Sequence, residues 1–143
     1  MKTKLLCATD GSHSADKAVD FAVELAKKLD AHLSFLTVTL VTGESASHSH
    51  FWDSSILDAA DAQLQSELHT AAGKAKSAGL TDISCVAVGG QNIAASIIQY
   101  AERNGYDHII TGSVGRTGVA RILLGSIAED VITKAHCPVT VVR

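Results

Sequence analysis

The sequence predicts an α/β protein, a three-layer sandwich in which helices cover both faces of a five-stranded parallel sheet. Short apolar segments alternate along the chain with longer segments whose apolar residues recur every three or four positions, the period of a helix. The short segments are almost continuously apolar, as strands buried on both faces are. The connections between successive segments are short enough for right-handed strand–helix–strand crossovers.

The first strand is expected at Lys4–Thr9, a mostly apolar run that stops at the turn residues Asp10, Gly11 and Ser12. A strand of this kind belongs in the middle of a sheet. The helix that follows can be capped by Ser12 or Ser14. Its apolar stripe is predicted to consist of Ala18, Phe21, Ala22, Leu25, Ala26 and Leu29.

The remaining elements continue the alternation. A second strand is expected around His32–Val38, a long amphipathic helix at Ile56–Ala78 ended by Gly79, and a third strand at Ile83–Val88 closed by Gly89-Gly90. Next come a helix marked by Ile93, Ile97, Ile98 and Ala101 and a strand at His108–Thr111. The last two elements are a helix at Ser126–Ala135, with Ile127, Val131 and Ile132 on its apolar side, and a strand at Val139–Val142.

The segment Thr42–Ser55 is polar and without periodicity, which indicates a loop. His48, His50 and Asp53 are candidate metal ligands, but a His-x-His pair on a Ser-rich segment lacks the fixed geometry and the closing set of ligands of a metal site. A solvated loop is therefore the preferred interpretation. Phe51 and Trp52 are expected to pin this loop to the surface or to cover a pocket mouth.

Gly112–Ser126 is the most distinctive stretch, a glycine-rich loop between the end of a strand and the start of a helix. Its glycines leave backbone N–H groups uncovered, and Ser126 adds a hydroxyl at the positive end of the helix dipole. Arg116 and Arg121 can donate charge-assisted hydrogen bonds to phosphate oxygens. The loop therefore suits an anion. An ordinary connection, with glycine for turning and Ser126 as the helix N-cap, explains Gly112 and Ser126 equally well.

The spacing of these glycines is neither that of a P-loop nor that of a dinucleotide-binding fingerprint. Gly112-x2-Gly115-x9-Gly125-Ser126 instead resembles the nucleotide-binding signature of the universal stress protein family. The resemblance extends from Thr3 to Arg143, so residues 1–143 are expected to form one domain of this type. Family members with the intact glycine signature bind ATP, whereas members without it do not.

The resemblance implies a sheet of order 3-2-1-4-5, in which the order reverses between strands 1 and 4. It implies ATP as the ligand, with AMP or ADP as alternatives and Mg²⁺ as the accompanying metal. Asp10 matches the acidic residue near the adenosine ribose, and Val38 matches the position whose backbone meets the adenine. The full set of nucleotide-binding residues that it implies is Ala8, Thr9, Asp10, Val38, Thr111, Gly112, Gly115, Arg116, Gly125, Ser126 and Ile127.

Two positions keep alternatives open. Physical reasoning alone favours a turn or cap carboxylate for Asp10, and the resemblance reverses that preference. The chain also departs from the family at Gly90-Gln91-Asn92, where a Gly-x-Pro is common, so the conformation before the third helix is not fixed by the resemblance.

The composition argues against several classes of function. A net charge of −3, with no basic cluster larger than Lys27-Lys28, argues against a nucleic-acid partner. No apolar run approaches the about 18–20 residues of a membrane span, and Met1–Lys4 leads into too short an apolar segment for a signal peptide. The protein is therefore expected in the cytoplasm, with Cys7, Cys85 and Cys137 reduced, structural and without cations nearby.

The preferred functional interpretation is an ATP-binding regulatory protein of the stress response, which acts through nucleotide-dependent conformation or partner binding. The alternatives are a slow ATPase or phosphotransferase that uses the same pocket, and a dimeric scaffold that works without nucleotide. No catalytic residue is assigned, because no base with a clear partner stands beside the glycine loop. A homodimer is predicted through Val139–Val142, a short apolar edge strand, in addition to an unidentified protein partner.

Overall fold

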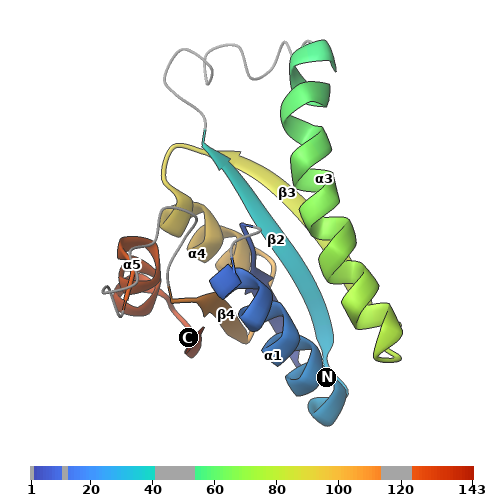
Figure 1. Cartoon of the computed structure of the whole chain (residues 1–143). Coiled ribbons are helices and arrows are strands. Elements are labelled where there is room, and N and C mark those ends of the chain that lie inside the picture. The colour runs from blue at the N-terminus through green and yellow to red at the C-terminus, as the bar shows by residue number, and fades with distance from the viewer. Residues whose placement is uncertain (1, 11–12, 41–53, 114–123) are drawn as a thin grey trace.

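The computed structural model describes residues 2–10, 13–40, 54–113 and 124–143. Strands and helices alternate along the chain, as the sequence predicts (Figure 1). In chain order they are β1 (Lys4–Ala8), α1 (His13–Leu29), β2 (His32–Leu40), α3 (Ser54–Ser77), β3 (Ile83–Gly90), α4 (Ile93–Arg103), β4 (His108–Gly112), α5 (Ser126–Lys134) and β5 (Val139–Val142).

The strands form one parallel sheet of order β3-β2-β1-β4-β5, which confirms the expected order. β1 lies in the middle, hydrogen-bonded to β2 on one side and to β4 on the other. α1 and α3 pack on one face of the sheet, and α4 and α5 pack on the other (Figure 1). The strand order reverses between β1 and β4, which is where open parallel sheets bind ligands at their carboxyl edge.

The inner strands bury side chains on both faces, which explains their continuous apolar runs. Along β1, Leu5 and Cys7 pack under α1 and α3, whereas Leu6 and Ala8 pack under α4 and α5. Phe35 of β2 is 0% exposed, and burying a side chain of that size contributes roughly 1.5–3 kcal/mol to stability.

Helix α1 confirms the predicted stripe at Ala18, Ala22 and Ala26, which are buried, but not at all of its positions. Phe21 and Leu29 of the predicted stripe are 39% and 51% exposed. The buried apolar side chains that the prediction missed are Ala15, Val19 and Val23. The reason is that α1 packs against both the sheet and α3, and small side chains allow it to approach both. In α5, Val131 is buried as predicted, but Ile132 is 47% exposed and Ala128 is buried.

Two element boundaries also differ from expectation. Gly89 and Gly90 belong to β3 rather than closing it, because β2 extends to Leu40 and pairs with Gly90. Ser54 and Ser55 belong to α3. The rest of the segment expected to be a loop, which contains His48, His50 and Trp52, lies outside the described residues.

The start of α4 has a defined cap at the position that the resemblance left open. Asn92 is the N-cap of α4, and its side-chain oxygen accepts a hydrogen bond from the backbone N–H of Ala95 at 2.9 Å. An asparagine cap therefore begins this helix. None of the helices in the described parts of the chain is long and apolar enough to cross a membrane.

Candidate functional site

The carboxyl ends of β1 and β2 are held together beyond the last paired residue of β1. The backbone N–H of Thr9 donates to the carbonyl oxygen of Leu36 at 2.9 Å. Thr37 Oγ1 donates to the carbonyl oxygen of Thr9 at 2.7 Å. These bonds continue the β1–β2 contact past Ala8, and Asp10 follows Thr9 at this edge of the sheet. Asp10 is half-buried there.

Gly112 ends β4 on the other side of β1, and α1 packs directly against it. A Cβ atom at this position would lie 2.5 Å from Ser14 Oγ, and 2.8 Å and 2.9 Å from the backbone carbon and oxygen of Ser14. Only glycine fits this contact. The packing of α1 thus explains Gly112 independently of any ligand.

Ser14 is not the helix cap that the sequence suggested, and Ser12 lies outside the described residues. Ser14 is buried within the first turn of α1, and its Oγ accepts a hydrogen bond from the backbone N–H of Ser113 at 2.8 Å. The same N–H reaches the carbonyl oxygen of Val142 at 2.9 Å. The hydrogen bonds of Ser113 therefore connect α1, the residue that follows β4 and the end of β5.

The glycine loop is closed at its base, and α5 begins there. The backbone N–H of Gly125 donates to the carbonyl oxygen of Ser113 at 2.6 Å. Gly125 is the N-cap of α5, with no side-chain cap, and its carbonyl oxygen accepts from Glu129 N at 3.0 Å. The alternative in which Ser126 caps the helix is therefore wrong: Ser126 is the first residue of α5 and is exposed.

The described members of the sequence-derived set lie at this one edge of the sheet: Ala8, Thr9, Asp10, Val38, Thr111, Gly112, Gly125, Ser126 and Ile127. Val38 and Ile127 pack against the buried core that contains Ala8, on the α4/α5 face. Gly115 and Arg116 lie outside the described residues.

The cysteine thiols are held in their protonated form. Burial raises the pKa of Cys7 to about 12. Burial also raises the pKa of Cys137, and Asp107 adds to the shift. Cys85 differs from expectation because it is exposed and has a cation nearby, Lys76, but burial of part of the thiol still raises its pKa.

A second polar cluster, at the amino edge of the sheet, was not found from the sequence. Asp82 Oδ1 lies 2.7 Å from His32 Nδ1, and His32 Nε2 lies 3.0 Å from Ser34 Oγ. An Asp–His–Ser chain has the order of a hydrolase triad. However, Ser34 is 0% exposed, and its Oγ also contacts the Tyr106 hydroxyl at 2.5 Å, so this oxygen is closed to a substrate. The cluster is a structural network.

Comparison with known proteins gives a consistent result. The family model described as the universal stress protein family matches residues 1–143. Universal stress protein MJ0531 of Methanocaldococcus jannaschii is 35% identical over 98% of this chain and 81% of its own length. The solved structure of hypothetical protein MJ0577 has a TM-score of 0.80 at 29% identity, covering 99% of this chain and 96% of that one. A universal stress protein solved in complex with cAMP has a TM-score of 0.78 at 26% identity, covering 99% and 97%.

Proposed function

The chain belongs to the universal stress protein family, and on that basis we propose that it is a regulatory protein that binds an adenine nucleotide at the carboxyl edge of its sheet. ATP is the expected ligand, and AMP or ADP would use the same adenosine site. The similar protein solved with cAMP supports an adenine nucleotide as the ligand class.

The observation that carries this proposal is the start of α5. Its N-cap, Gly125, has no side-chain cap, and the bond from Gly125 N to Ser113 O keeps this helix end beside the end of β4. The first N–H groups of a helix have no intrahelical acceptor, and together with the helix dipole they attract an anion. The exposed Ser126 hydroxyl adds a donor. The phosphates are therefore proposed to bind at Gly112, Gly125, Ser126 and the loop glycine Gly115, with Arg116 nearby.

The adenosine would lie on the β2 side of β1, whereas the phosphates lie on the β4 side. Asp10 is proposed to accept hydrogen bonds from the ribose hydroxyls, and the Val38 backbone to meet the adenine edge. Mg²⁺ fits this scheme as a metal that arrives with the phosphates, since it is usually held by phosphates and one or two carboxylates. The described residues contain no group of three or more acidic, His or Cys side chains that would hold it alone. Bound Mg²⁺ would neutralise phosphate charge.

A route from nucleotide to partner is available through Ser113. Its N–H is shared between Ser14 Oγ at 2.8 Å and the carbonyl oxygen of Val142 at 2.9 Å, so the loop entrance and the end of β5 are directly linked. We propose that phosphate binding at the loop alters the presentation of β5, the edge strand through which a homodimer is expected to form. Nucleotide occupancy would then control the dimer or its protein partner.

The test begins with mass spectrometry of any nucleotide released from gently purified protein. After nucleotide removal, ATP at a hundredfold over its dissociation constant should stabilise the fold by about 2.7 kcal/mol, a thermal shift of several degrees. Gly115→Val places a branched side chain where phosphate must approach the backbone, so it should abolish this shift and keep the ligand-free melting temperature. Ser126→Ala should weaken the shift only in part. An ATP-free wild type that shows no shift would overturn the proposal.

A further inference from the structure

The outer side of β3 is an open edge of the sheet. β3 pairs with β2 over eight consecutive positions without a bulge, and no described residue pairs with its other side. Edge strands of soluble proteins are commonly protected by charged residues, proline, bulges or short length. β3 has none of these protections, and it is twice as long as β5, the other edge strand. We propose that this edge binds an extended, acidic segment of a partner protein, which adds a strand to the sheet.

The register of the sheet determines which backbone groups of β3 face outward. The backbone N–H of Leu33 in β2 donates to the carbonyl oxygen of Asp82 at 3.1 Å, and Leu33 pairs with Ile83. In a parallel ladder this pattern directs the N–H and C=O groups of every second residue of β3 away from β2. The outward groups belong to Ile83, Cys85, Ala87 and Gly89. An added strand would pair with them, as in other complexes formed by strand addition.

The side chains of β3 leave this backbone accessible. Cys85, Ala87 and Gly89 are small and exposed, whereas Val86 and Val88 pack against the core under α4 and α5. A bound segment would therefore contact mainly backbone along β3, and β3 itself would restrict its sequence little. Selectivity has to come from side chains that flank β3 on the two neighbouring helices.

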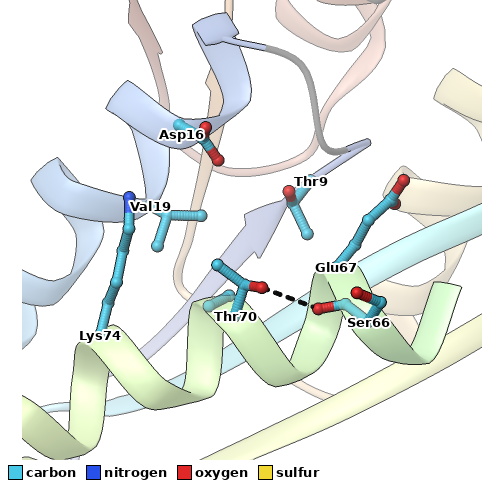
Figure 2. A pocket seen from close by; sticks show the side chains of 8 residues that line it. Thr9, Asp16, Val19, Ser66, Glu67, Thr70 and Lys74 are labelled. Atoms are coloured by element: carbon cyan, nitrogen blue, oxygen red, sulfur yellow. Dashed lines mark hydrogen bonds between the residues drawn. The ribbon is translucent and has the colours of Figure 1, made fainter. Parts of the chain in front are cut away.

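Lys76 supplies a positive charge beside β3 on the α3 face. It lies near Cys85, where burial raises the pKa of the thiol and the charge of Lys76 partly opposes that shift. Lys74 differs because it lines the cavity between α1 and α3 (Figure 2), and its Nζ lies 3.1 Å from the carboxylate of Asp20. Lys76 is exposed and forms no ion pair with any described residue, so its charge is available to a partner.

Arg103 supplies a second positive charge, on the α4 face. A Cβ atom on Gly90 would collide with Ser96 Oγ, so the Ser96 side of α4 faces β3. Arg103 follows Ser96 by seven residues, which places it on the same side of the helix two turns further on. Lys4 Nζ donates to the carbonyl oxygen of Asn104, so this end of α4 lies at the amino edge of the sheet. Arg103 is exposed and has no ion pair within the described parts of the chain.

The charges around β3 favour an acidic segment over a second copy of this chain. Glutamates on the two faces of an added strand would meet Lys76 on one side and Arg103 on the other, and complementary charges of this kind select the partner. β3 itself carries no charge, so pairing β3 with another β3 would bring like charges together without compensation. The acidic segment is therefore the better occupant.

The test is a calorimetric titration of nucleotide-free, full-length protein at low salt with the octapeptide acetyl-Glu-Val-Glu-Val-Val-Glu-Val-Glu-amide, which has two glutamates on each face of an extended strand. Saturable binding is expected, and the peptide with lysine in place of every glutamate should bind about tenfold more weakly or not at all. Lys76→Gln and Arg103→Gln should each weaken binding about threefold, and together about tenfold. Lys27→Gln, at an exposed position of α1, is the matched control and should bind as the wild type does.

Hydrogen exchange locates the bound peptide. In the free protein the outward amides of Cys85, Ala87 and Gly89 should exchange rapidly, whereas those of Val86 and Val88 should be protected by their bonds to β2. The peptide should protect the outward amides.

No saturable binding, equal binding of the lysine peptide, or unchanged affinity in the double variant would overturn the proposal. Outward amides that are already protected without peptide would show that the edge is occupied, and would also refute it. Protection gained at Val139–Val142 instead would assign the peptide to β5 and exclude β3. The Gly115→Val variant should bind the peptide normally, so a failure of the nucleotide proposal remains distinguishable from a failure of this one.

Discussion

Gly112 occupies a position where one additional carbon atom does not fit. An alanine Cβ would come within 2.9 Å of the backbone of Ser14, and backbone cannot rotate away as a side chain can. Gly112→Ala is therefore expected to destabilise the protein by about 1–3 kcal/mol, and to lower the melting temperature by several degrees. Thermal and urea unfolding measure both quantities.

Gly73 provides the matched control for that substitution. It lies in α3, and a Cβ atom there would meet nothing within 4 Å. Gly73→Ala should stabilise the protein by up to about 1 kcal/mol, because alanine is the better helix former. If both glycine variants had the same stability, the close contact between Gly112 and α1 would not be the reason for glycine at this position.

The cysteines should not make the protein redox-sensitive. Burial raises the pKa of Cys7 to about 12, and the pKa values of Cys85 and Cys137 are also raised. Since the thiolate is the reactive form, alkylation by iodoacetamide at pH 7 should be slow at all three. ATP affinity should be the same in protein treated with mild oxidant and with reductant. A several-fold difference between these two samples would show that a thiol controls the site.

At the scale of the elements, the Asp82–His32–Ser34 network links the amino ends of β2 and β3. The hydrogen bond from His32, and then that from Lys2, lowers the pKa of the Asp82 carboxyl below its ordinary value of 3.8. When folding lowers the pKa of a carboxyl, its charged form stabilises the fold at every pH above the pKa that it has in the unfolded chain. This stabilisation is lost as the pH falls through the pKa of the folded state. The network should therefore support the fold at neutral pH and fail in acid.

The corresponding experiment compares wild type with Asp82→Asn by urea unfolding between pH 7 and pH 2.5. The wild type should be the more stable at pH 7, and the difference should shrink as the pH falls below 3.8. Glu24→Gln is the control, because its exposed pair with Lys28 in α1 belongs to the weak class of surface salt bridges. A stability difference for Asp82→Asn that is constant across this pH range would contradict the assignment.

At the scale of the whole molecule, the sheet leaves two edges, β3 and β5. β5 consists of the uncharged, half-buried residues Val139–Val142, and an apolar edge without a charge invites pairing with another chain. β3 ends in Gly89 and Gly90, which offer no side chain to a partner. The dimer is therefore predicted at β5.

Light scattering at micromolar concentration should show a dimer for the wild type and a monomer for Val141→Lys. Ala87→Lys places the same charge on an exposed position of the other edge strand, and should remain dimeric. A monomeric wild type, or dissociation by Ala87→Lys alone, would exclude β5 as the interface.

Much of the fold could be predicted because the spacing of apolar residues within a strand or helix reflects which of its faces are buried. The continuous apolar runs of β1 and β4 reflect side chains buried on both faces, and the three- to four-residue repeat of α4 reflects one buried side. The same alternation placed Asp10 and Gly112 each at the carboxyl end of a strand. The spacing of Gly112, Gly125 and Ser126 indicated an anion site by a local pattern, and resemblance then supplied the strand order and the nucleotide.

Tertiary structure alone decided the features that depend on contacts between distant residues. Gly112 is explained by Ser14 pressing against it, and the bond from Ser113 N to Ser14 Oγ joins residues 99 positions apart. His32 and Asp82, which are 50 positions apart, meet only because β2 and β3 are neighbours. The buried side of α1 was predicted only in part for the same reason: α3 as well as the sheet packs against this helix, so Val19 and Val23 are buried and Phe21 is exposed. A sequence pattern shows which side of a strand or helix is apolar. The packing of several elements decides which residues contact that side. The cavity between α1 and α3 likewise exists only because these two helices pack side by side.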